Sequence, residues 1–187
     1  MSAEWAERIW RWRVRSGTLS IILVLLLARP SWTSLAWGGV VAVLGLTVRA
    51  WAAGHLRKEK ELAVSGPYRY TRNPLYLGNL LLGFGIGLAA RSWWVAGLLL
   101  LYFLVFYPAI IQRERDRLTR LFPDSYPGYR ALVPLFLPWP TKRAAAGNGA
   151  FRWALFLQNK EYRAEAGAAA LWLLLVLKIV LFPRFLP

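Results

Sequence analysis

Residues 65–78 read Ser-Gly-Pro-Tyr-Arg-Tyr-Thr-Arg-Asn-Pro-Leu-Tyr-Leu-Gly and separate two long apolar segments. Pro67 and Pro74 restrict φ and disfavour helix at the residues before them, so the sequence predicts an irregular backbone here. Beside a bilayer, an irregular backbone is stable only at the water interface, inside protein or along a cavity. Composition alone fits a polar connector between membrane helices as well as it fits a binding segment.

The remainder of the chain is strongly apolar, with 57% hydrophobic residues and 11 Trp among 187 residues. Five apolar runs approach or exceed the ~17 residues that cross a hydrocarbon core. They are predicted as spans at 14–28, 33–54, 75–90, 92–111 and 164–182. Trp and Ile at helical spacing among arginines predict an interfacial helix over 1–15, and 151–158 predicts a second short one. The expected fold is an all-α integral membrane protein with about five transmembrane helices in a single domain, 1–187.

The formal net charge of +15 is distributed unevenly. Lys and Arg concentrate in 1–17, 55–74 and 113–163, and the segments between them hold few. Such alternation is typical of the positive-inside rule, so it argues against a nucleic-acid partner and for a cytoplasmic N-terminus. Attraction of the basic segments to anionic lipid headgroups is a secondary expectation.

The residue types present argue against a metal site and a nucleotide-binding loop and leave two interpretations of Arg49. The chain has no Cys, its single His is His55, and its acidic residues lack metal-ligand spacing, so no metal site is predicted. Gly83 and Gly87, within an apolar helix, predict close helix packing rather than a nucleotide-binding loop. Arg49, inside a predicted span, either extends to the headgroups or contacts an anion.

Three blocks together resemble a known family. Residues 66–78 resemble the G-x-Y-x-x-x-R-H-P-x-Y-x-G signature of isoprenylcysteine carboxyl methyltransferases and their bacterial relatives in the phospholipid methyltransferase superfamily. Residues 114–118 are similar to the family's E-E-x-x-L, and 121–134 to its F-G-x-x-Y-x-x-Y-x-x-x-V-P. Asn73 stands where His is usual, but the similar segment of phosphatidylethanolamine N-methyltransferases also has Asn at this position. Arg115 replaces the second Glu of the E-E-x-x-L block. The similarity covers a core of about 45–138.

The resemblance implies S-adenosylmethionine as cofactor. The expected cofactor-binding residues are His55, Gly66, Tyr68, Arg72, Asn73, Pro74, Tyr76, Gly78 and Glu114, although His55 is also consistent with a purely structural role. Glu114 suits ribose hydroxyls or the ammonium, and Arg72 suits the carboxylate. Tyr rings suit the sulfonium. The expected catalytic residues are Arg49, Asn73 and Arg130, with the two arginines as candidates for an acidic acceptor or phosphate, and Arg130 equally suited to anchor at the interface.

The expected activity is methyl transfer to a lipidic or amphiphilic carboxylate or amine at the cytoplasmic face of a bacterial inner membrane. A carboxylate needs no base, whereas an amine must lose a proton, for which His55 and Glu114 are the candidates. Three alternatives remain open: a nicotinamide-dependent membrane reductase with a related helical core, a non-enzymatic lipid-binding protein with a decayed site, and an acceptor that is a small thiol or another amphiphile. The sequence leaves the physiological acceptor and the oligomeric state open.

Overall fold

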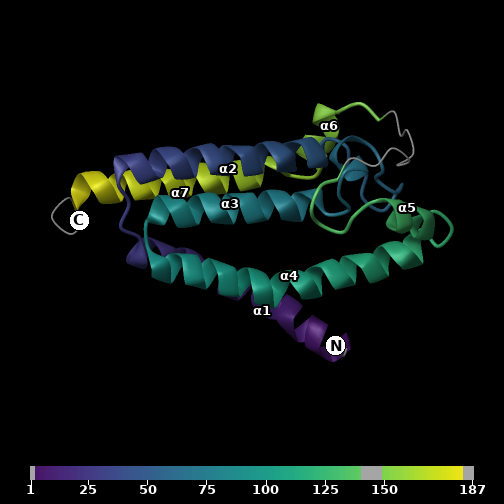
Figure 1. Ribbon diagram of the computed structural model, residues 1–187, viewed down its shortest axis with the longest axis horizontal. Coiled ribbons are helices and arrows are strands. Elements are labelled where there is room, and N and C mark those ends of the chain that lie inside the picture. The colour runs from purple at the N-terminus through teal and green to yellow at the C-terminus, as the bar shows by residue number, and fades with distance from the viewer. Residues whose placement is uncertain (1–2, 140–148, 183–187) are drawn as a thin grey trace.

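The computed structural model describes residues 3–139 and 149–182, and within these ranges all regular structure is helical (Figure 1). The all-α prediction is therefore confirmed for this part of the chain. The elements are α1 (Ala3–Leu27), α2 (Trp32–Ala53), the 3-10 helix η1 (Gly66–Arg69), α3 (Pro74–Ala90), α4 (Trp93–Leu121), α5 (Tyr126–Leu132), α6 (Trp153–Gln158) and α7 (Tyr162–Leu181).

Three helices, α2, α4 and α7, are long and apolar enough to cross a membrane, with 22, 29 and 20 residues. Together they fit an integral membrane protein. Two shorter apolar helices accompany them, 16–27 within α1 and the 17-residue α3. At 1.5 Å per residue α3 is about 25 Å long, close to the lower limit for a span. The prediction of five spans depends on these two helices and stays a prediction.

Three predicted boundaries differ from the helices observed. The sequence predicted an interfacial helix ending at residue 15 and a span from residue 14, whereas α1 is one helix through both. The predicted helix 151–158 begins two residues later, as α6. Residues 1–2 lie outside the described residues, and the interfacial position of 1–15 stays a prediction. The predicted span 92–111 is also extended, because α4 passes through Pro108 and continues through the charged segment 112–121.

Small residues bring α2 and α3 close together. A Cβ added to Gly38 would lie 2.5 Å from the backbone oxygen of Gly85, and one added to Gly45 would lie 2.7 Å from that of Gly78. On each helix the two glycines are seven residues apart, about two turns, so they share one face. The backbones can therefore approach to a separation that larger side chains would prevent.

The prediction that Gly83 and Gly87 make this helix contact is wrong in its choice of glycines. A Cβ added to Gly83 would meet nothing within 4 Å, and at Gly87 it would meet only Leu99, at 3.9 Å. Both glycines line an apolar cavity of about 550 Å³ between α3 and α4 instead. Gly85, between them in sequence, points to α2 because it lies on the opposite face of the helix.

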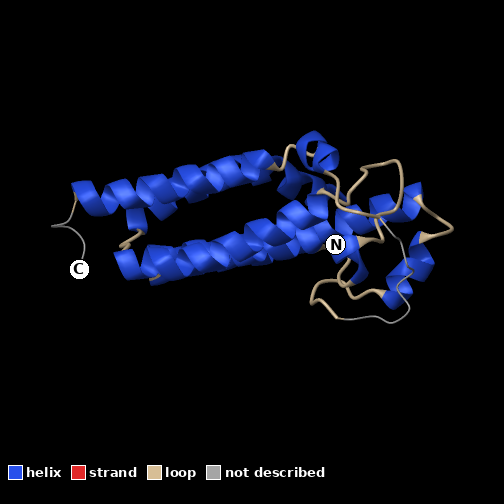
Figure 2. Ribbon diagram, turned by 90° about the horizontal axis from the view of Figure 1, so that it is seen from above, coloured by secondary structure: helices blue, strands red, loops and turns tan. Residues whose placement is uncertain are grey.

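The two ends of the molecule differ in character, and Figure 2 shows the helices in two rows with most of the loops gathered at one end. At the other end the α1–α2 turn is tied to the α3–α4 turn: Arg29 N donates to Ala90 O over 2.7 Å, and Ser34 Oγ donates to Ala89 O over 2.9 Å. A buried apolar cluster surrounds these bonds. The connector 54–73, α5 and α6 all lie at the end with the loops (Figure 1).

Candidate functional site

Two segments about sixty residues apart in sequence are joined by hydrogen bonds at the loop end. Arg72 N donates to Pro134 O and Trp139 N donates to Tyr70 O, both over 3.0 Å. The Tyr129 hydroxyl donates to Tyr68 O over 2.8 Å. The connector before α3 is therefore held against the segment that contains α5, and these are the segments that carry two of the three sequence motifs.

Asn73, at the centre of the first motif, is buried and oriented. Its side-chain Nδ2 donates to Leu135 O over 2.8 Å, and its backbone N donates to the Thr71 hydroxyl over 3.3 Å. A buried amide with a fixed donor bond is costly to displace because its partner would lose a bond as well. Asn73 thus links the start of α3 to the 129–139 segment as well as lining the cavity described next.

A cavity of about 280 Å³ lies between the connector, the first turn of α3, the charged end of α4 and α5. This volume is close to the lower limit of the ~300–1,000 Å³ that small-molecule sites occupy. Six residues predicted to bind the cofactor line it: Tyr68, Arg72, Asn73, Pro74, Tyr76 and Glu114. Tyr76 and Glu114, 38 residues apart in sequence, therefore share one cavity.

Arg72 supplies an unsatisfied cation to this cavity. Its Nε and Nη1 atoms are buried and have no hydrogen-bond partner in the part of the chain that the structure describes. A buried charged donor without a partner costs free energy, and an anion would remove that cost. The guanidinium is therefore suited to a carboxylate or phosphate bound in the cavity.

Glu114 supplies the opposite charge, from the part of α4 (112–121) that continues beyond the apolar 93–111. Burial raises the pKa of Glu114 above its usual value, and the nearby Lys58 opposes that shift. Its one described ion pair is a long contact of 4.0 Å with Arg117. Arg115, at the position of the family's second carboxylate, pairs with Asp116 over 3.2 Å and does not line the cavity. The replacement therefore adds no positive charge to the cavity wall.

Aromatic rings form another part of the cavity wall. Burial raises the pKa of Tyr68 and of Tyr129 well above the usual tyrosine value, so both phenols are neutral at physiological pH. Tyr76 packs edge-on against Tyr107, with ring centroids 5.8 Å apart, and Tyr107 stacks on Phe103 at 3.6 Å. The orientation of the Tyr76 ring is thus supported from α4.

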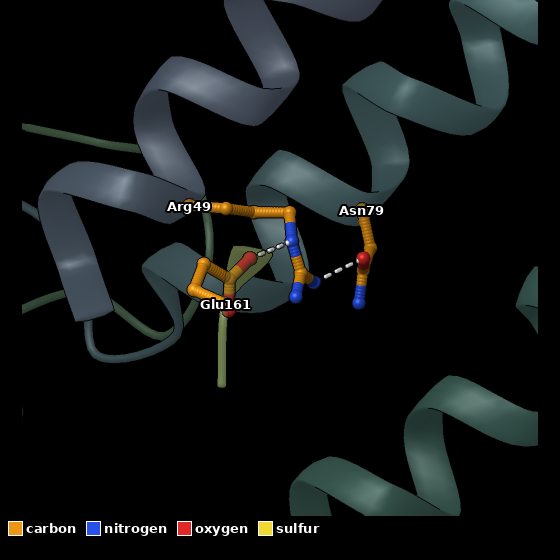
Figure 3. A network of polar contacts seen from close by, with 3 residues as sticks. All are labelled: Arg49, Asn79 and Glu161. Carbon is orange, nitrogen blue, oxygen red and sulfur yellow. Dashed lines mark hydrogen bonds and ion pairs between the residues drawn. The ribbon is translucent and has the colours of Figure 1, made fainter. Parts of the chain in front are cut away.

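Arg49 lies away from this cavity, in an internal ion pair (Figure 3). Its Nε donates to Glu161 Oε1 over 2.6 Å, and its Nη1 donates to Asn79 Oδ1. The side chains of Arg49 and Glu161 are 15% and 7% exposed. The structure therefore contradicts extension of Arg49 to the headgroups, because the guanidinium bridges α2, α3 and the start of α7. Contact of Arg49 with an acceptor stays a prediction.

The remaining predicted residues lie outside the cavity. His55 Nδ1 is 2.8 Å from Trp51 O, and the His55 ring packs against Phe151 and over Gly66, which has a positive φ of 57°. Gly78 serves the α2–α3 contact, and Arg130 is exposed on α5. His55 and Gly66 thus shape the connector, and none of these four residues lines the cavity.

Some lining residues were missed by sequence reasoning. Lys58, Arg117, Leu118, Phe122 and Tyr129 line the cavity but carried no predicted role. Tyr129 belongs to the third motif (121–134) and Leu118 is the last residue of the second (114–118), but neither was given a role in binding. Arg49 and Glu161 are 112 residues apart, and nothing in the sequence indicated that they pair.

The helices and the cavity define an all-helical membrane protein with a polar site at one end. A family model described as phospholipid methyltransferase matches residues 19–125, more than half of the chain. The chain therefore belongs to the phospholipid methyltransferase family, within the isoprenylcysteine/phospholipid methyltransferase superfamily, as the sequence motifs predicted. No solved structure matches the chain.

Two curated relatives are similar over most of the chain. The nickel-cobalt-cadmium resistance protein NccN of Alcaligenes xylosoxydans xylosoxydans is 35% identical over 142 residues, which cover 71% of this chain and 65% of that protein. The cobalt-zinc-cadmium resistance protein CzcN of Cupriavidus metallidurans is 30% identical over 161 residues, which cover 79% of this chain and 72% of that protein. The chain thus spans about two thirds to three quarters of the length of these relatives.

Proposed function

We propose that the protein transfers a methyl group from S-adenosylmethionine to a lipidic or amphiphilic acceptor at the cytoplasmic face of the inner membrane. Family membership indicates a membrane methyltransferase, and the donor, the acceptor class and the N-terminus in the cytoplasm are parts of the proposal. The observation that carries it is Arg72: this cavity-lining cation has two buried nitrogens that find no hydrogen-bond partner among the described residues, in a cavity that Glu114 also lines.

The residues of the cavity suit each part of the donor molecule. Arg72 would bind its carboxylate, and Glu114 would accept hydrogen bonds from ribose hydroxyls or the ammonium. Among the described ion pairs none joins Arg72 to Glu114, so the two do not neutralise each other. Tyr68 and Tyr76 would offer ring faces to the sulfonium, a contact worth ~0.5–2 kcal/mol.

Bound S-adenosylmethionine would supply an electrophilic methyl group attached to a sulfonium. The protein's own contribution would be to orient that group toward the acceptor and to exclude water, since holding two reactants in contact removes much of the entropic barrier. Of the two base candidates for an amine acceptor, only Glu114 lines the cavity. A carboxylate acceptor would need no base, and Glu114 would then serve donor binding alone.

A metal-resistance role is named for both relatives. For this chain we propose that any such role would operate through methylation of a membrane component. The sequence has no Cys and a single His, which leaves few of the soft ligands that these metals prefer.

A titration with S-adenosylhomocysteine, the donor product, tests the donor assignment. The detergent-solubilised full chain is expected to unfold at a higher temperature as ligand is added, because a ligand of the native state stabilises it by mass action. NADPH in a parallel titration should give no shift, and a shift with NADPH alone would favour a reductase instead.

Incubation of membranes with methyl-labelled donor then tests transfer. We expect label in the lipid-extractable fraction only when the protein is present. Binding of S-adenosylhomocysteine without any labelled product would favour a non-enzymatic lipid-binding protein. Label in a water-soluble thiol would overturn the lipidic acceptor while keeping the donor.

A further inference from the structure

A second cavity, of about 450 Å³, lies at the same end of the molecule, between the start of the connector and α6. Its polar lining comes from Arg57, Lys58, Lys60, Arg152, Gln158 and Asn159. It shares only the segment 56–58 with the cavity proposed for the donor. Neither the family assignment nor the proposed methyl transfer gives this cavity a role.

The charge around this cavity is one-sided. Four cations line it, and among the described residues that line it none is acidic. Arg57 pairs with Glu61 over 2.9 Å, whereas Lys58, Lys60 and Arg152 have no ion pair with another described residue. Like charges around one hollow raise the local positive potential, so the cavity favours an anion.

The cavity wall is fixed by hydrogen bonds rather than formed by loose side chains alone. Asn159 Nδ2 donates to Ala53 O and to Leu56 O, each over 2.9 Å. Arg152 N donates to Gly54 O over 3.0 Å, and the Phe151 ring lies directly on Gly54, where a Cβ would clash with it. These contacts hold α6 against the end of α2, so the backbones that carry the cations do not have to be assembled on binding.

The position of α6 indicates which anion is available. Trp153 and Leu157 on α6 are 68% and 58% exposed, and Trp51 at the end of α2 is exposed as well. Trp at the end of a membrane helix and on a short adjoining helix is typical of the headgroup layer. The cations beside these apolar side chains therefore lie at the depth of lipid phosphates.

We propose that this cavity binds the phosphate of an anionic phospholipid headgroup, at a site distinct from the methyl-donor cavity. Lys60 and Arg152, on opposite walls, contact the phosphate, and Gln158 adds a neutral hydrogen-bond donor. The acyl chains lie along the exposed apolar residues of α6. Since this site lies outside the donor cavity, the proposal stands whether or not methyl transfer is established.

The test compares ligands on the full chain in a neutral detergent. Thermal unfolding is followed with dihexanoyl phosphatidylglycerol, dihexanoyl phosphatidylcholine, glycerol 3-phosphate and inorganic phosphate. The anionic lipid is expected to raise the unfolding temperature at lower concentration than the others. Equal effects of phosphatidylglycerol and phosphatidylcholine would overturn a site for anionic headgroups. Equal effects of phosphatidylglycerol and inorganic phosphate would overturn the lipid as its source.

Variants then locate the site. Lys60→Gln/Arg152→Gln is expected to raise the apparent Kd for the anionic lipid about 30-fold, since each cation near anionic lipid contributes about 1 kcal/mol. The matched control is Arg120→Gln/Arg163→Gln, which removes two exposed cations from the same end, outside both cavities. The ligand-free unfolding temperature, unchanged from the parent in both variants, reports that each is folded. An unchanged lipid Kd in the cavity variant, or an equal loss in the control, would overturn the proposal.

Discussion

Arg72→Met separates a residue that binds a ligand from one that supports the fold. Within residues 3–139 and 149–182 the buried Nε and Nη1 of its guanidinium have no hydrogen-bond partner, so the ligand-free protein bears the cost of an unsatisfied charged group, about 1–3 kcal/mol. Met keeps the apolar stem and removes that cost. The backbone N–H bond from residue 72 to Pro134 O remains possible in the variant. The ligand-free variant is therefore expected to be at least as stable as the parent.

The same change should weaken binding of the donor product. Hydrogen bonds to a charged group contribute ~1.5–3 kcal/mol, so loss of the contact raises the Kd for S-adenosylhomocysteine about 10- to 150-fold. At a ligand concentration 100 times the parent Kd, the parent gains about 2.7 kcal/mol of stability. The variant then gains only about 0.3–1.4 kcal/mol by the same relation.

Thermal unfolding with and without ligand measures both effects, and Arg120→Met provides a control for loss of an exposed arginine. Urea unfolding of the ligand-free proteins adds an independent measure of stability. The reasoning fails if Arg72→Met lowers ligand-free stability by several kcal/mol while the ligand-induced shift stays equal to that of the parent. That result would make Arg72 part of the fold and would leave the proposed donor site without its anchor.

Three further predictions test other contacts. Glu114→Gln should weaken S-adenosylhomocysteine binding. Because burial raises the pKa of Glu114, the parent should bind with full affinity above that pKa and lose affinity as the pH falls through it, starting at a higher pH than for an ordinary carboxyl. A Kd that does not change with pH would count against this role. Gly85→Leu should destabilise the α2–α3 packing by about 1–3 kcal/mol, whereas Gly83→Leu should have little effect because a Cβ there meets open space. Equal unfolding temperatures of the two variants would contradict the packing argument. Glu161→Gln should lower the free energy of unfolding by about 3–5 kcal/mol, because it leaves the buried charge of Arg49 uncompensated. The double variant Arg49→Met/Glu161→Met should restore part of that stability. A Glu161→Gln variant as stable as the parent would refute the buried pair.

Local patterns predicted the helices well because each helix is dictated by its own neighbours in sequence. Apolar length specified α2, α7 and the start of α4 to within a few residues, whereas α4 ends ten residues beyond the predicted span, and Pro74 marked the point where the connector ends and α3 begins. Motif spacing also brought the right residues together: Tyr68, Arg72, Tyr76 and Glu114 line one cavity. The donor role of that cavity remains a prediction.

Side chains selected by a motif can nevertheless serve the backbone around a site. His55 and Gly66 were both predicted to bind the cofactor, yet they pack on one another because Gly66 has a positive φ and no side chain to obstruct the ring. Periodicity likewise placed Gly83 and Gly87 on one helix face but could not show which face turns to α2. That choice depends on where Gly38 and Gly45 lie in the folded protein.

By itself the sequence determined the class of protein, the positions of its apolar helices and the family to which it belongs. These properties are encoded in composition and in short-range spacing. Only the tertiary structure decided that Arg49 pairs with Glu161, that Nε and Nη1 of Arg72 have no partner among the described residues, and that α6 closes a basic cavity against the connector. In each case side chains from distant segments meet in a low-dielectric interior or across a helix interface. The partner and the burial of each side chain are therefore set by packing rather than by its neighbours along the chain.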